Sequence, residues 1–261
     1  MSETVIRLSV FFGLFAAVAL WELWRPRRPL AASKGRRWAT NWAVSVTDAV
    51  MVRLVFGAAA VGAAMDAEAS GVGLFNVLAW PPIAEGLIVF VLLDLAIWFQ
   101  HWLSHRVPIL WRLHRVHHSD RDMDVTTAIR FHPIEIALSM LFKIGLVYAL
   151  GAPAWAVILF EVVLNGSAMF NHGNMRLPRA IDRVLRLVIV TPDMHRVHHS
   201  VIRAEHDTNF GFNLSIWDRL FGTYTAQPEG GHDGMTVGLA DHQNDRPTRF
   251  LWTLAFPLRR S

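Results

Sequence analysis

Ten of the thirteen histidines are candidate metal ligands, and eight of these lie in short groups whose spacing suits metal binding. One pair has the form H-x3-H and two triplets have the form H-x2-H-H. Residues three or four apart project from one face of a helix, so each group presents two or three imidazoles in one direction. The ten candidate ligands are His101, His105, His114, His117, His118, His132, His172, His195, His198 and His199.

The remaining histidines are interpreted differently. His232 and His242 stand alone in the C-terminal tail, and an isolated histidine is usually a structural residue. His206 follows the last triplet by seven residues, and its role is left open. His132 directly precedes Pro133, which can start a helix, so His132 can either bind metal or cap that helix.

Histidine ligands in this number favour a site with two metals. Imidazole binds zinc, copper, iron and nickel, and a tetrahedral zinc needs only three or four protein ligands. The H-x3-H pair lacks the adjacent glutamate of H-E-x-x-H metalloproteases. There is no cysteine, which excludes disulfides, iron–sulfur clusters and thiolate ligands. Two irons bound by histidine are the better fit.

The composition predicts that membrane-spanning helices position this site. Hydrophobic residues make up 53% of the 261 residues, charged residues make up 18%, and the mean hydropathy is +0.31. A span needs about 20 apolar residues. Five segments approach this length, and they are 5–24, 42–64, 84–105, 134–150 and 153–170. The fold class is therefore predicted to be all-α, a multi-span bundle with a histidine-lined cap.

The connections add detail to this prediction. Gly151-Ala152-Pro153 predicts a tight hairpin between the last two spans. Segment 181–190 is too short to span and carries arginines on one side, which predicts a helix at the membrane interface. The first apolar segment is followed, not preceded, by a basic cluster, so a retained anchor is expected in place of a cleaved signal peptide.

Basic residues predict the orientation. Connections 25–41 and 106–133 are rich in arginine, whereas connection 65–83 has acidic residues and no basic one. By the positive-inside rule, the first two connections and the tail 171–261 are cytoplasmic and the N-terminus is external. All ten candidate ligands then lie at the cytoplasmic side. Since the basic residues flank the spans or lie among histidines, the pI near 10.3 does not indicate nucleic-acid binding.

Several motifs together resemble one family. HWLSH, HRVHH, RFHPIE, NHGN and a second HRVHH are followed by NFGFNLSIWDRLFGTY, all within 84–240. This order resembles the fatty acid hydroxylase and sterol desaturase superfamily. The resemblance implies a cytoplasmic dimetal site with two iron ions, O2 as co-substrate, and oxidation of C–H bonds. It also implies that most of the clustered histidines contact or orient metal.

The resemblance sets the expected domains and partners. Residues 1–83 are expected to be an anchor of two spans within the same bundle, 84–240 the catalytic domain and 241–261 a tail. Membrane lipid and a lipid-like substrate are the expected partners. No electron-transfer module is recognised in the sequence, so a separate ferredoxin-like or cytochrome b5-like donor is expected. The substrate class and the choice between hydroxylation and desaturation stay open.

Among the ionisable residues of the predicted spans, four lie at a similar depth of about 14–18 Å from the cytoplasmic ends. They are Arg53, Asp94, Lys143 and Glu161. Their balanced signs predict one or two ion pairs inside the bundle, because unpaired charges there are costly.

Polar residues continue the histidine-bearing helix faces into the membrane. Asp94 and Trp98 lie on the face of the third span that carries histidines, and Glu161 and Asn165 lie on that of the fifth. These four residues are candidates for the wall of a substrate cavity. Contacts between helices explain them equally well.

The predicted function is O2-dependent, di-iron hydroxylation or desaturation of a lipid-like substrate such as a sterol or a fatty acyl chain. A zinc-dependent membrane hydrolase is the nearest alternative, since zinc also binds histidine. A metal transporter is less compatible with the pattern, because its ligands are expected at the middle of the spans.

Overall fold

A computed structural model describes residues 3–78 and 80–259, and it is built from helices. Three isolated backbone bridges are the only β-type pairings within these ranges. The α-helices are α1 (Glu3–Trp24), α2 (Lys34–Phe56), α3 (Ala59–Ser70), α4 (Leu74–Leu78), α5 (Pro82–Arg106), α6 (Pro108–His118), α7 (Pro133–Leu150), α8 (Ala154–Asn171), α9 (Arg179–Leu185), α10 (Pro192–His198), α11 (Arg203–His206), α12 (Ile216–Leu220), α13 (Gly231–Gly234) and α14 (Phe250–Ala255). Four short 3-10 helices complete the described part, and they are η1 (Thr127–Ile129), η2 (Ala240–His242), η3 (Arg246–Thr248) and η4 (Phe256–Leu258). The predicted all-α class is confirmed.

Five helical segments in the described chain are long and apolar enough to cross a membrane, as predicted. The hairpin prediction is also confirmed, since α7 ends at Gly151 in a left-handed conformation and α8 begins directly after Pro153. The predicted span 42–64 has the wrong limits. Its helix α2 already begins at Lys34, and the helix ends at Gly57. The φ of Gly57 is 58°, a backbone conformation that residues with a side chain rarely adopt.

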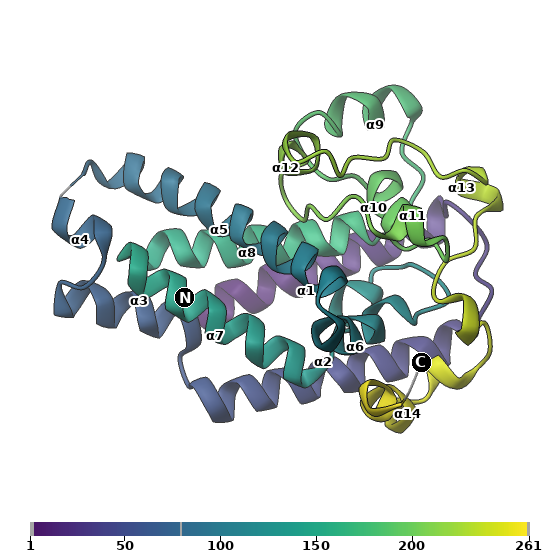
Figure 1. Ribbon diagram of the computed structural model, residues 1–261, viewed down its shortest axis with the longest axis horizontal. Helices are drawn as coiled ribbons and strands as arrows, with labels where there is room; N and C mark the ends of the chain where they lie inside the picture. Colours follow the sequence, from purple (N-terminus) through teal and green to yellow (C-terminus); the bar gives the residue numbers. More distant parts are fainter. Residues whose placement is uncertain (1–2, 79, 260–261) are drawn as a thin grey trace.

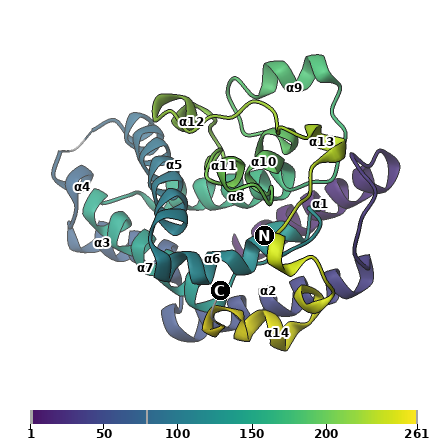
Figure 2. The same ribbon diagram turned by 45° about the vertical axis from the view of Figure 1, so that its right-hand side comes forward.

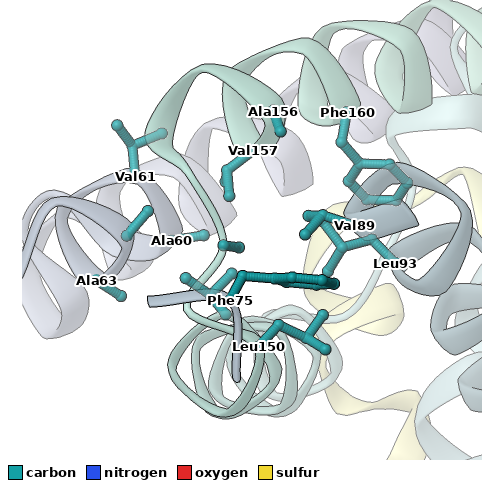
Figure 3. Packing of buried hydrophobic residues seen from close by; sticks show 13 residues of the cluster. Ala60, Val61, Ala63, Phe75, Val89, Leu93, Leu150, Ala156, Val157 and Phe160 are labelled. Carbon is teal, nitrogen blue, oxygen red and sulfur yellow. The ribbon is translucent and has the colours of Figure 1, made fainter. Parts of the chain in front are cut away.

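Apolar packing joins the ends of the spans that lie far from the cap. A cluster of buried side chains from α3, α4, α5, α7 and α8 fills this end of the bundle. The Phe75 ring of α4 reaches into it between Leu150 and Val157 (Figure 3). The connection 65–83, expected as an external loop, therefore contributes helices to the core. Packing at this end fixes the angles at which α5, α7 and α8 approach the histidines.

The other end of the bundle carries a cap made of two insertions. Residues 107–132 leave after α5, and residues 172–259 follow α8 (Figure 1). The turned view shows α6, α10 and α11 together against the ends of α5 and α8 (Figure 2). Short helices α6 and α10 both start with proline at the first helical position, which suits a sharp helix start.

A buried ion-pair network attaches α2 to the first insertion. The Arg37 guanidinium lies 2.5 Å from an Asp120 oxygen and 2.6 Å from an Asp124 oxygen, and the three side chains are almost fully buried. Burial alone would raise the pKa of Asp120, but the positive charge and hydrogen bonds of Arg37 lower it to about 2. Because Asp120 follows α6 by two residues, this network fixes the helix that bears three histidines.

The last residues fold back on the cap. The Thr40 hydroxyl of α2 donates to the Thr248 carbonyl, and the Arg130 guanidinium donates to the Pro247 carbonyl. Arg115 of α6 donates to the Phe256 carbonyl. The segment 241–259 is thus part of the same packed unit; residues 260 and 261 of the predicted tail lie outside the described residues. Helix α9 exposes Ile181 and Val184, and its place at a membrane interface stays a prediction.

The predicted charged layer is only partly correct. The Lys143 amine lies 2.9 Å from one Glu161 oxygen, as expected for a pair. The second cation is Arg7 of α1, 2.6 Å from the other oxygen, and not Arg53. Arg53 is exposed and donates to the Gly57 carbonyl, whereas Asp94 accepts from the Trp217 indole at 2.8 Å. The prediction placed the four residues in one layer because their depths are similar. In the structure their side chains point in different directions around the helix axes and therefore meet different partners.

Candidate metal centre

Nine of the ten predicted histidines converge beneath the cap as two adjacent groups. The ligand atoms within each group lie within 4.8 Å of one another, and all nine residues are buried. The first group contains His101, His105, His114, His118 and His198, and the second contains His117, His172, His195 and His199. The arrangement fits two metal ions, one per group.

Each H-x2-H-H triplet serves both groups. In α6, His114 and His118 are four residues apart and belong to the first group, while His117 belongs to the second. Helix α10 has the reverse pattern, with His198 alone in the first group. Neighbouring residues on a helix diverge by about 100°, so adjacent histidines point to different groups. Each adjacent pair therefore offers one imidazole to each group.

Backbone carbonyls fix the protonation of four imidazoles. The Nδ1 atoms of His101, His117, His172 and His198 each lie 2.7–3.2 Å from a carbonyl oxygen. A carbonyl oxygen can only accept, so Nδ1 carries the proton and Nε2 presents its lone pair. This is the tautomer that binds a metal through Nε2.

The facing nitrogens need a cation between them. Nε2 of His172 lies 3.1 Å from Nε2 of both His117 and His195, and Nε2 of His101 lies 3.1 Å from that of His114. Two lone pairs at this distance repel each other. Two nitrogens bound at right angles to one metal, each about 2.1 Å from it, would also be about 3 Å apart. The spacing therefore fits shared metal ligation.

Buried nitrogens without protein partners support the same conclusion. In the described part of the chain, no hydrogen-bond partner is found for Nε2 of His105, His118, His198 and His199. Leaving such groups unsatisfied is costly, and metal ligation would satisfy them. Burial, with the neighbouring imidazoles, lowers the pKa of His118 and His198 well below the usual value, and burial lowers that of His172 to about 4. The imidazoles are neutral, as ligands must be.

Two carboxylates support the first group, and neither was identified from the sequence. Glu135 Oε1 lies 2.6 Å from Nδ1 of His114, and Asp207 Oδ1 lies 3.3 Å from Nδ1 of His105. Such carboxylate–histidine pairs orient metal ligands and make them more basic. The signal for Glu135 was its place in RFHPIE, next to a predicted helix start. His206 also belongs here, since it forms a small group with His105 and Asp207.

His132 does not join either group. Its Nδ1 accepts from the Ile134 amide at 3.2 Å, and its Nε2 lies 3.2 Å from the Leu254 carbonyl. It is the N-cap of α7, which was the alternative role open from the sequence. His242 packs on Trp252, in agreement with a structural role, and His232 lies 3.8 Å from Asp193, away from both groups.

A cavity of about 700 Å³ extends from the first group into the bundle. His101 and His114 line one end, and Lys143, Glu161 and Asn165 line the wall farther from the cap. Two of the four predicted cavity residues are thus in place. The other two, Asp94 and Trp98, do not line it.

Asp94 and Trp98 hold the segment after α10 against α5. The Trp98 indole donates to Asp218 at 3.0 Å, and Asp218 accepts from the Phe210 amide at 2.8 Å. The Phe210 carbonyl in turn accepts from His101. These side chains contact the segment that positions His101. Trp98 also lines a second cavity, of about 660 Å³, so the predicted role of Asp94 and Trp98 in a substrate cavity stays a prediction.

An all-helical bundle with five candidate spans and two buried histidine groups defines a class of helical membrane protein whose cap could hold metal ions. The sequence comparison assigns the chain within this class. Residues 86–223, more than half of the chain, match the fatty acid hydroxylase family, and the chain belongs to that family. The resemblance noted from the motifs is confirmed.

Curated relatives include three lipid-modifying enzymes. Ornithine lipid hydroxylase OlsE of Rhizobium tropici is 35% identical over 153 residues, which are 57% of this chain and 44% of that protein. Alkylglycerol monooxygenase of Homo sapiens is 31% identical over 168 residues, covering 62% and 35%. Cholesterol 25-hydroxylase of Rattus norvegicus is 26% identical over 147 residues, covering 56% and 48%. The matched segment covers less than half of each relative. No solved structure matches the chain significantly.

Proposed function

We propose that the protein is an O2-dependent, di-iron oxygenase that hydroxylates or desaturates a C–H bond of a lipid-like substrate. The observation that carries the proposal is the pair of buried histidine groups at the end of a cavity that extends into the bundle. The relatives, which are named as hydroxylases and monooxygenases of lipids, support the same reaction class.

The nine histidines would hold two iron ions, which supply reductive activation of O2 when bound. The remaining residues have simpler tasks. Glu135 and Asp207 fix the orientation of His114 and His105. The cap covers the groups and excludes bulk water, since all nine imidazoles are buried. The cavity holds the substrate so that one C–H bond lies beside His101 and His114.

The overall reaction requires electrons and protons from outside. Hydroxylation consumes the substrate, one O2, two electrons and two protons, and gives the alcohol and one water. Desaturation consumes the same reagents and gives the alkene and two waters. A separate ferredoxin-like or cytochrome b5-like protein would supply the electrons. We place the histidine site and the C-terminus on the cytoplasmic side, where the basic connections favour it.

Metal analysis and O2 consumption test the proposal. Protein purified without chelators should contain close to two iron ions per chain and should consume O2 when a chemical reductant and extracted membrane lipid are supplied. Replacing His105 or His199 by Ala, one from each group, should abolish O2 consumption and lower the metal content. The matched control His242→Ala should change neither, because His242 lies in the tail.

Zinc in place of iron would contradict the proposal. A zinc-dependent membrane hydrolase would hold zinc, consume no O2 and release products without an added reductant. About one metal per chain in a fully active preparation would also exclude the dimetal centre.

A further inference from the structure

One carboxylate in the cavity wall has no role in the metal centre. Asp48 of α2 lines the cavity and is only 8% exposed. Its Oδ1 atom has no hydrogen-bond partner among the described residues. Leaving a buried carboxylate oxygen without a donor is unfavourable, and a donor from outside the chain would remove this cost.

The other charged residues of the cavity wall do not donate to this oxygen. Glu135 lies in the wall of the same cavity as Asp48, so it adds no donor for the Asp48 oxygen. Glu135 already accepts from His114, and Lys143 already pairs with Glu161. Arg53 also lines the cavity, but it already donates to the Gly57 carbonyl. Asp48 is therefore suited to an N–H or O–H donor.

The rest of the cavity fits a hydrocarbon body. Phe11 of α1, Val52 of α2, Leu164 of α8 and Phe212 are apolar residues of its lining. Helices α1 and α2 contact each other through aromatic pairs such as Phe15 with Trp42. Residues of both helices line the cavity. Both helices precede residue 86, where the family match begins.

The distance along α2 relates this carboxylate to the metal centre. Asn41 accepts from Arg130, whose carbonyl accepts from His117, so Asn41 lies at the level of the histidines. Asp48 is seven residues farther along the helix, a rise of about 10 Å along its axis. Asp48 therefore lies about two helical turns farther into the bundle than Asn41.

We propose that Asp48 binds the hydroxyl or ammonium group of an amphiphilic lipid whose hydrocarbon part lies along the cavity toward His101 and His114. Naming this molecule as the substrate depends on the proposed oxygenase function; its binding does not. Helices α1 and α2 then determine substrate selection, although they lie outside the family match.

Three probes with the same hydrocarbon chain test the proposal. Hexadecylamine, hexadecan-1-ol and hexadecanoate are titrated into the metal-loaded protein in detergent, and bound probe is counted by native mass spectrometry. The amine and the alcohol should bind up to about tenfold more tightly than the acid, the size of one hydrogen bond. Asp48→Asn should remove the advantage of the amine, and Asp48→Leu should remove that of both. The control Asp66→Asn removes an exposed carboxylate outside the cavity and should leave all three affinities unchanged.

A second pair of variants locates the bound probe. Val52→Trp fills the cavity and should weaken all three probes, whereas Leu54→Trp adds the same bulk at a position that is 80% exposed and should have no effect. Unchanged metal content shows that each variant is folded. Equal binding of the three probes, or an amine preference that survives Asp48→Leu or Val52→Trp, overturns the proposal. Selective binding without O2 consumption would contradict only the oxygenase function.

Discussion

Glu135 shows how a residue that need not touch metal can control a metal site. Its carboxylate fixes His114 in the tautomer whose Nε2 faces His101. Removing such a partner typically costs about 10–100-fold in metal affinity or activity. We expect Glu135→Ala to lose metal to a chelator at a lower concentration by about this factor, measured by metal analysis after dialysis. Glu135→Gln keeps an acceptor for Nδ1 and should lose less. The control Glu68→Gln changes an exposed glutamate and should match the unmodified protein.

The histidines themselves were predictable from spacing, and their division into two groups was not. H-x3-H and H-x2-H-H show which imidazoles share a helix face, because the helix period is local. Which face meets which partner depends on packing between α5, α6, α8 and α10. For the same reason His206 and Asp207 could not be assigned, since they reach His105 only through the fold of the segment after α10.

At the scale of elements, Arg37 joins α2 to the loop that follows α6. Arg37→Ala would leave Asp120 and Asp124 buried without their cation, which typically costs about 3–5 kcal/mol. We expect a large loss of thermal stability, partly restored by adding Asp120→Asn. Arg36→Ala is the matched control, because the neighbouring Arg36 pairs with Asp245 at the surface. Such exposed pairs contribute less than about 1 kcal/mol.

The same network gives the cap resistance to acid. The pKa of Asp120 is about 2 in the folded protein, below the value of about 3.9 in an unfolded chain. Its contribution to stability is therefore complete above pH 4 and is lost as the pH falls through about 2. Thermal unfolding between pH 4 and 7 should show no change from this pair.

Glu161 connects three helices, since it accepts from Arg7 of α1 and Lys143 of α7. Glu161→Ala leaves two cations in the bundle without their shared anion, whereas Lys143→Ala leaves Glu161 with Arg7. Glu161→Ala should therefore be the more destabilising change, and adding Lys143→Met should recover part of the loss. Equal effects in thermal unfolding would contradict this order.

The sequence predicted the pair of Lys143 with Glu161 and missed the other partners. Counting residues from a span end gives position along a helix and nothing about direction around the bundle. Arg53 and Asp94 were therefore expected beside the wrong partners. Arg7 lies near the start of the first span, and the packing of α1 on α8 brings it to Glu161.

At the scale of the whole molecule, orientation is the main prediction. Reporter fusions after residues 30, 120 and 261 should all score cytoplasmic, because the intervening connections carry the basic residues. A fusion near residue 72 should score external. An external C-terminus would invert the protein and would place the metal centre away from a cytoplasmic electron donor.

The division of each histidine triplet between the two groups has a consequence for how the protein acquires metal. Helices α6 and α10 each contribute to both groups, so fixing one group restrains the imidazoles of the other. Binding of the first ion would then include the loss of conformational entropy of the imidazoles in both groups. The second ion would bind to imidazoles that are already partly ordered, and this is positive cooperativity. Chains with one ion should then be scarce at every stage of loading. Most chains would hold either no ion or two ions. A limited iron supply would therefore lower the number of chains with two ions and would produce few chains with one.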